Sequence, residues 1–185
     1  MDRREFVQSS AALMLAGCGS GADEMPQEFT LQPSPLMRSS KSSFGFGVQG
    51  EWTPGLTFAS PGDLSVTYGL QLGRYTRFGP MVWVAAIVQT SSFTHTTASG
   101  ALRITGLPLG VINDAAPFTG AIDYRGLTFA PLSQVIVKAT GNNNYCTLRA
   151  CGSGASSETV DNTHAVSGTA KDFRFSLWYL TSEVS

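Results

Sequence analysis

Short apolar runs alternate with clusters of turn residues along the chain beyond Pro54. One run, which begins at Leu64, alternates with period two and places Leu64, Val66 and Tyr68 on one face, because successive strand side chains point to opposite faces. Residues 81–88 are instead apolar at every position, as expected for a central strand that is covered on both faces. Valine, isoleucine and tryptophan in this run favour a strand over a buried helix.

Five further runs have the length and composition of strands, namely residues 100–106, 127–130, 134–138, 145–149 and 173–180. The segments between the strands are rich in serine, glycine and asparagine and are predicted to be loops, at 91–99, 110–120, 141–144 and 152–169. No segment has a convincing helical period. The pattern predicts an all-β domain over residues 50–185, with about eight strands in a jelly-roll-like antiparallel β-sandwich.

The N-terminal part of the chain has a different pattern. Residues 1–18 combine Arg3 and Arg4 with a short apolar stretch that ends at Cys18, and they are similar to a twin-arginine export signal followed by a lipobox, whose cysteine becomes acylated. The alternative is a helix that anchors the chain to a partner. Residues 19–49 are rich in proline, serine and glycine and are predicted to form an extended arm that lies along a neighbouring surface.

Composition and charge exclude some classes of function. Of the 185 residues, 42% are hydrophobic, which is enough to build one sizeable core. Charged residues make up only 14% of the chain, and 12 Lys and Arg are balanced by 13 Asp and Glu. Since this balance supplies no positive field to hold a phosphate backbone, nucleic acid is not expected as a partner.

Residues that usually carry catalysis or hold cofactors are sparse. The two histidines, His95 and His164, stand in Ser/Thr-rich stretches without the spacing of a zinc site, and each is interpreted as a loop residue. Residues 45–50 match the glycine pattern of dinucleotide-binding loops, but Pro54 follows too closely for the helix that would hold the pyrophosphate. We therefore expect no cofactor, no metal ion and no enzymatic activity.

A glycoside hydrolase is the least favoured alternative. Such an enzyme needs two carboxyl groups about 5–9 Å apart, a distance that sequence does not reveal. The candidates are Asp114, Asp123, Asp161 and Asp172. Aspartates in turns are ordinarily structural, because they bond to their own backbone.

Two cysteines lie close together in the sequence. If the chain turned back at Gly152, Cys146 and Cys151 could form a small disulfide loop. The bond is more expected in an exported protein than in a particle assembled in reducing cytoplasm. Otherwise both residues are buried thiols, and a metal site made with His164 is a remote third interpretation.

Several residues have the chemistry of a sugar-binding site. Aromatic rings stack on the apolar face of a pyranose, while amide and carboxylate groups bond to its hydroxyls. The candidates with this composition are Tyr124, Arg125, Asn142, Asn143, Asn144 and Tyr145. Trp178 is a further candidate if its face of the last strand is exposed. The prediction concerns these loops collectively and no single residue.

Four blocks of the sequence resemble a domain of tailed-bacteriophage virion proteins. They are Trp52–Phe58, Gly73–Gly79 with the apolar strand that follows it, Gly100–Pro108 and Phe173–Thr181, in the expected order. The resemblance implies a carbohydrate-binding jelly roll, often trimeric, of the kind found at tail-fibre ends and on capsids as head fibres or decoration proteins. An export-like N-terminus is not part of that module.

Two hypotheses follow. In the first, the chain is a non-enzymatic protein of a virion surface, with residues 1–49 attached to other capsid or tail proteins. Its β domain projects as a homotrimer and displays a surface for a host glycan. The chain has no long fibrous shaft, which favours a decoration protein or short fibre. The alternative is an exported lipoprotein, anchored to a cell envelope through Cys18, that carries a glycan-binding domain.

Overall fold

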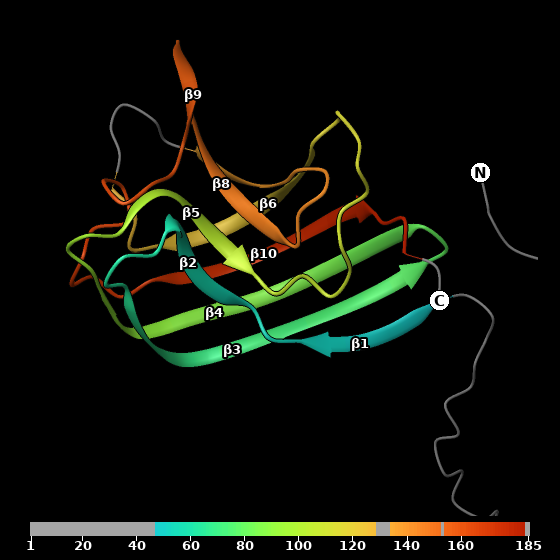
Figure 1. The fold of residues 1–185 in the computed structure, drawn as a ribbon, viewed down its shortest axis with the longest axis horizontal. Coiled ribbons are helices and arrows are strands. Elements are labelled where there is room, and N and C mark those ends of the chain that lie inside the picture. The colour runs from blue at the N-terminus through green and yellow to red at the C-terminus, as the bar shows by residue number, and fades with distance from the viewer. Residues whose placement is uncertain (1–46, 129–133, 153, 184–185) are drawn as a thin grey trace, which may run out of the picture. The chain divides into compact units, whose positions relative to one another are not determined.

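The computed structural model describes residues 47–128, 134–152 and 154–183 (Figure 1). Within these residues the backbone forms ten strands and no helix. The strands are β1 (Val48–Trp52), β2 (Gly55–Ser60), β3 (Ser65–Phe78), β4 (Met81–Thr94), β5 (Ser99–Thr105), β6 (Phe118–Arg125), β7 (Gln134–Ala139), β8 (Tyr145–Gly152), β9 (Ala155–Thr159) and β10 (Asp172–Leu180). The predicted all-β class is confirmed. No helix in this part of the chain has the length and hydrophobicity to cross a membrane.

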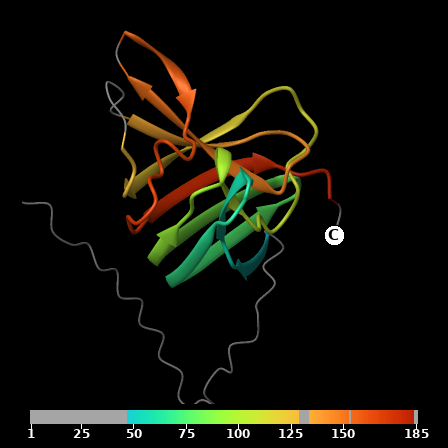
Figure 2. The ribbon, with the colours of Figure 1, turned by 60° about the vertical axis from the view of Figure 1, so that its left-hand side comes forward.

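The strands form one continuous antiparallel sheet in the order β1-β3-β4-β10-β6-β7-β8-β5-β2, with β9 paired to β8. Strand β6 joins the two halves, because residues 118–121 pair with β7 while residues 122–125 pair with β10. The sheet curls there, and β2, β5 and β8 lie across the long strands β3, β4 and β10 (Figures 1 and 2). The predicted jelly-roll sandwich of two separate sheets is not confirmed, because β6 keeps both layers in one sheet.

The core lies inside the curl. Phe58 on β2 and Phe93 on β4 meet edge to face with ring centroids 5.8 Å apart, although their strands are far apart in the order of the sheet. Phe173, Leu177 and Tyr179 on β10 are buried in the same cluster, as their alternation predicts. Full burial of each such side chain contributes about 1.5–3 kcal/mol to the free energy of folding. Contacts between the two layers therefore hold the sheet in its curled form.

Strand β4 differs from its prediction on one face. Val82, Val84 and Val88 are fully buried, whereas Trp83 and Ile87 on the opposite face remain half-exposed. The layer of β2, β5 and β8 covers only the inner face of β4. The sequence predicted full burial on both faces, but Trp83, Ala85, Ile87 and Gln89 on the outer face are only partly buried.

Several element boundaries also differ from the predictions. Strand β6 begins inside the predicted loop 110–120, β9 lies inside the predicted loop 152–169, and β4 runs on to Thr94 through part of the predicted loop 91–99. The strand predicted at 127–130 is wrong where the structure describes it, since Leu127 and Thr128 are in no strand. Gly126 has a φ of +87°, a left-handed conformation that ends β6 just before this segment.

The predicted disulfide is also corrected. Cys146 and Cys151 carry free thiols and belong to one extended strand, β8. Five residues of extended chain span about 16 Å, well beyond the reach of a disulfide, and side chains of odd spacing point to opposite faces. The chain does not turn back until after Cys151. The alternative of two buried thiols holds for Cys146, whereas Cys151 is only half-buried. Burial raises the pKa of the Cys146 thiol to about 12.

Predictions for the N-terminal segment fall largely outside the described residues. The export signal or anchoring helix at 1–18, including Cys18, and the arm up to residue 46 are in this category. Strand β1 begins at Val48, two residues before the predicted start of the β domain.

Candidate functional site

The candidate sugar-binding residues fall into three places in the fold. Asn142, Asn143 and Asn144 form the turn between β7 and β8. Tyr124 and Arg125 end strand β6, and Trp178 lies on the outer face of β10. The structure therefore divides the predicted set among three separate places.

The asparagine turn is held rigidly against the loop that precedes β6. The backbone N–H of Asn142 donates to the carbonyl of Val111 at 3.0 Å, and the N–H of Val111 donates to the carbonyl of Asn143 at 2.9 Å. Asn142 has a φ of +64°, a left-handed conformation that asparagine adopts more readily than most residues. The side-chain Nδ2 of Asn143 donates to the carbonyls of Thr140 and Gly141, which closes the turn from within.

Gly141 lets this turn approach its neighbour. A Cβ at this position would lie 2.6 Å from the carbonyl oxygen of Asp114, closer than any side chain tolerates. Only glycine fits, because it has no Cβ. The contact holds the three asparagines at a fixed distance from the loop opposite.

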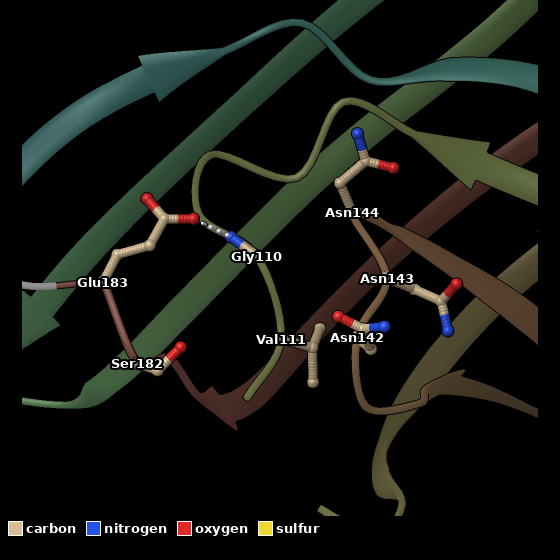
Figure 3. Close-up of a pocket in the computed structure, with 7 residues that line it drawn as sticks. All are labelled: Gly110, Val111, Asn142, Asn143, Asn144, Ser182 and Glu183. Atoms are coloured by element: carbon tan, nitrogen blue, oxygen red, sulfur yellow. Dashed lines mark hydrogen bonds between the residues drawn. The ribbon is translucent and has the colours of Figure 1, made fainter. Parts of the chain in front are cut away.

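A hollow of about 350 Å³ opens between this turn, the loop and the C-terminal segment (Figure 3). It is lined by Gly110, Val111, Asn142, Asn143, Asn144, Ser182 and Glu183, and we call it the asparagine hollow. Glu183 Oε1 accepts a hydrogen bond from the backbone N–H of Gly110 at 2.6 Å, and its main-chain carbonyl accepts one from Arg77. These bonds fix the C-terminal side of the hollow.

The lining is rich in hydrogen-bonding groups that the fold does not use. Among the described residues, no hydrogen bond engages the side-chain amides of Asn142 and Asn144, and both residues are exposed. Each amide offers a carbonyl acceptor and two N–H donors, and the carboxylate of Glu183 has further acceptor capacity. Such a set matches a ligand with many hydroxyl groups.

Tyr145 does not supply the aromatic ring that we predicted for this place. It is not among the residues that line the hollow, and the guanidinium of Arg103 lies 4.3 Å from the centroid of its ring. The ring is therefore engaged in a cation–π contact on the surface of β5 and β8. The asparagine hollow therefore offers no aromatic ring for stacking, and its polar side chains are those of Asn142, Asn143, Asn144, Ser182 and Glu183.

A second hollow, of about 390 Å³, contains the other predicted pair. It is lined by Asp123, Tyr124, Arg125, Asp172 and Arg174. Arg174 donates to Asp123 at 3.1 Å and to Asp172 at 2.8 Å, and Gln89 also donates to Asp172 at 3.0 Å. Most of the charge in this hollow is thus paired within the protein, and Tyr124 packs partly against the core.

The same geometry addresses the glycosidase alternative. Of the four candidate aspartates, the structure brings together Asp123 and Asp172, with the guanidinium of Arg174 between their carboxylates. A glycosidase holds the scissile bond of its substrate in that position. Asp161 bonds to Thr163 and His164, and Asp114 accepts from the N–H of Ala116, as expected for turn aspartates.

The histidines have structural surroundings. His95 lies in an aromatic cluster, 5.0 Å from the ring of Phe58, and its Nε2 is 2.9 Å from the carbonyl of Ala165. His164 Nδ1 is 2.8 Å from Asp161, and its Nε2 is 3.2 Å from Glu158. Within the described part of the chain no cluster of three or more histidine, cysteine or acidic side chains is arranged to hold a metal ion.

Sequence reasoning missed Glu183, Ser182 and Gly110. No local signal marks them, because they reach the asparagines only when the chain folds. The N–H of Ile112 donates to the carbonyl of Leu180 at 2.7 Å, which brings the end of β10 beside the loop. The two segments are far apart in sequence, so residue pattern alone could not pair them.

The fold of this chain is similar to that of part of a phage tailspike, which confirms the predicted resemblance to a phage virion surface domain at the level of the fold. The matching structure is the crystal structure of the Dettilon tailspike protein (gp208), with a TM-score of 0.55 and 20% sequence identity. The match covers 73% of this chain and 24% of the tailspike chain. No protein-family model and no curated protein matches the sequence.

Proposed function

We propose that this chain is a structural protein of a phage tail and that its β domain binds a host-surface glycan in the asparagine hollow. Residues 1–49 attach it to other virion proteins, and the domain performs no chemistry. The observation that carries the proposal is the rigid turn that presents two unengaged asparagine amides beside Glu183.

Support for the phage assignment comes from the fold. The match to a tailspike extends over 73% of the chain. A tail position agrees with that likeness better than a capsid position does. The charge balance of the chain also fits a role outside the nucleic-acid compartment of a particle.

Support for a glycan as ligand comes from the rigidity and chemistry of the hollow. Sugar hydroxyls donate and accept at once, and a side-chain amide complements both roles. The turn is already held by backbone bonds to Val111, so little ordering is required when a ligand binds. The openness of the hollow suits a surface polysaccharide, whose chain continues beyond the bound residues.

The proposed lack of catalysis is supported by the surroundings of the acidic residues. Asp123 and Asp172 are both occupied by Arg174, and Glu183 is hydrogen-bonded to the backbone of Gly110. Asp123 and Asp172 line the same hollow, but the guanidinium of Arg174 lies between their carboxylates. A receptor-binding role does not require such a pair.

The test measures binding of host-surface polysaccharide to the purified full chain by calorimetry or on a glycan array. We expect the double variant Asn142→Gly, Asn144→Ala to bind about tenfold to a hundredfold more weakly, because two hydrogen bonds of about 1 kcal/mol or more are lost. Glycine at 142 preserves the left-handed backbone, so the change removes the amide without straining the turn.

The matched control is Asn162→Ala, which removes an asparagine amide outside the hollow and should leave affinity unchanged. If wild-type protein binds no glycan of the host surface, or if the double variant binds as tightly as wild type, the asparagine hollow is not the receptor site.

A further inference from the structure

Glu183 gives the asparagine hollow its charge. The other lining residues are glycine, valine, serine and asparagine, so among the described residues no lysine, arginine or histidine lines the hollow. Figure 3 shows Glu183 on one side and the asparagine turn on the other, with Gly110 and Val111 between them. A ligand in the hollow therefore meets a negative group that the lining does not balance.

Hydrogen bonds fix the position of this charge. Oε1 of Glu183 accepts from the backbone N–H of Gly110 at 2.6 Å, and the backbone N–H of Glu183 donates to the hydroxyl of Thr181 at 3.2 Å. Thr181 is itself buried, so the segment that carries the carboxylate is anchored to the body of the domain. No hydrogen bond within the described residues engages Oε2, which stays available as an acceptor.

Arg77 lies beside Glu183 but does not neutralise its carboxylate. The guanidinium of Arg77 donates to the main-chain carbonyls of Gly79 and Glu183, so it binds the backbone. In the part of the chain that the structure describes, no ion pair engages the Glu183 side chain. The charge therefore remains available to act on a ligand.

The elements beside the asparagine turn also leave the hollow without a positive group. Arg103 on β5 and Lys138 on β7 both lie opposite Thr147 of β8, beyond the end of the turn, and neither lines the hollow. The loop opposite the turn contributes Asp114, a second acidic side chain. Glu183 dominates the charge that a ligand experiences, because it alone among these groups belongs to the lining.

The size of the hollow keeps any bound ligand near this charge. A volume of about 350 Å³ corresponds to a sphere roughly 9 Å across, close to the Debye length of about 8 Å at physiological ionic strength. A charged group on a bound sugar thus interacts with Glu183 wherever it lies in the hollow. Repulsion between like charges at this separation weakens binding by about threefold to tenfold.

Sugars without an acidic group do not experience this repulsion. A hydroxyl can donate to Oε2 of Glu183, while other hydroxyls bond to the amides of Asn142 and Asn144. Hydrogen bonds to an ionised acceptor are stronger than those between neutral groups. The amine of an amino sugar gains the further attraction of opposite charges. A carboxylate, phosphate or sulfate on the sugar brings only a second negative charge.

We infer, on the basis of the proposed glycan site, that the asparagine hollow selects neutral and amino sugars over acidic sugars and that Glu183 determines this specificity. A surface polysaccharide built from uronic acids is then a poor ligand. A polysaccharide with hydroxyl and amino groups at the bound residue is a good one.

The test measures binding of the full chain to a glycan array with matched pairs of oligosaccharides. Members of a pair differ only in whether carbon 6 carries a hydroxyl or a carboxylate, as in glucose against glucuronic acid and galactose against galacturonic acid. Wild type should bind the neutral member of a recognised pair about threefold to tenfold more tightly at low salt. At about 1 M salt, where the Debye length is about 3 Å, this preference should disappear.

Glu183→Gln should bring the two affinities to within about twofold of each other, because the charge is removed. Glutamine keeps an oxygen that can accept from Gly110, and retained binding of the neutral oligosaccharide shows that the variant is folded. The matched control is Glu51→Gln. It changes the net charge by the same amount, but Glu51 lies on β1 outside the hollow, and its side chain is 69% exposed. This control should keep the wild-type preference.

Three results would overturn the inference, and they are distinguishable from one another. Equal affinities of wild type for both members of a recognised pair would remove the specificity and leave the glycan site intact. A preference that persists in Glu183→Gln would remove the role of Glu183. If wild type binds no oligosaccharide of either kind and no host polysaccharide, the proposed function itself fails, and the specificity fails with it.

Discussion

Asp63 holds together two turns at one end of the domain. Its carboxylate accepts hydrogen bonds from the backbone N–H groups of Thr96 and Thr97, at 2.9 Å and 2.7 Å, and from both threonine hydroxyls. Bonds to the ionised form hold the pKa of Asp63 well below its usual range, with the Thr96 hydroxyl as the largest cause. The charge of one side chain therefore fixes the connection between β4 and β5.

We predict that Asp63→Asn lowers the melting temperature at neutral pH, because the amide replaces one of the two acceptor oxygens with a donor. The folded-state pKa is depressed, so this contribution is present above the unfolded-state pKa of about 3.9 and is lost as the pH falls through the folded-state value. The difference in melting temperature between wild type and Asp63→Asn should be constant above about pH 5 and shrink below about pH 4. Thermal unfolding followed by circular dichroism at several pH values measures it.

Asp114→Asn is the control, since within the described residues that carboxylate accepts one local bond, from the N–H of Ala116 at 3.1 Å. It should change stability much less than Asp63→Asn. If the difference in melting temperature between wild type and Asp63→Asn grew as the pH fell from about 5 to about 3, the ionised carboxylate would not be what stabilises the connection between β4 and β5.

Lys171 shows how a single residue can escape sequence interpretation. It stands at the end of a polar loop and yet is only 1% exposed. Its Nζ donates to the carbonyls of Val166 and Thr169, both at 2.8 Å, and lies 4.8 Å from the ring centroid of Phe93. Burial lowers the pKa of Lys171 to about 8. Lysine is ordinarily exposed, so no local pattern predicts this position.

At the scale of the elements, the docking of β1 depends on a glycine. Trp52 on β1 is opposite Gly73 on β3, and its indole lies where a side chain at 73 would be. A Cβ at Gly73 would approach the ring to 2.5 Å. Trp52 also contacts Phe175 edge to face at 6.5 Å, so the indole anchors the short edge strand to the core.

We predict that Gly73→Ala destabilises the domain by about 1–3 kcal/mol, because the methyl group displaces a packed ring. Chemical denaturation followed by tryptophan fluorescence measures the loss. Gly69→Ala on the same strand is the matched control, since the nearest atom to its Cβ would be 3.9 Å away. That change should be neutral or slightly stabilising. Equal effects of the two substitutions would show that the contact with Trp52 does not hold β1.

Strands were predictable where side chains alternate or where β-branched residues cluster. Strand β10 alternates strictly, and its buried set of Phe173, Phe175, Leu177 and Tyr179 agrees with the pattern. Strand β6 was not predicted at all, and its start fell in the predicted loop 110–120 because Thr119 and Gly120 resemble a loop. Gly120 packs so closely against the backbone of β10 that no Cβ fits there. Its small size serves the close approach of strands and is no sign of a turn.

At the scale of the whole molecule, the two hypotheses for the N-terminus make opposite predictions. A virion protein that assembles inside its host should keep Met1, or begin at Asp2 after removal of the methionine. We therefore expect the intact mass of the protein in purified particles to include residues 1–17. A mass that lacks these residues and carries a lipid on Cys18 would favour the exported lipoprotein and contradict a phage tail role. Intact-protein mass spectrometry decides between them.

The sequence by itself determined the all-β class, most of the strands and the lack of a catalytic motif, because these depend on local alternation and residue type. Only the tertiary structure decided that β6 joins both layers into one curled sheet, that Cys146 and Cys151 stay apart, and that Glu183 meets the asparagine turn. These features depend on contacts between segments distant in the chain, which local patterns do not encode. Strand β4 is the clearest case. The sequence marked residues 81–88 as buried on both faces, and the fold buries only the inner face fully.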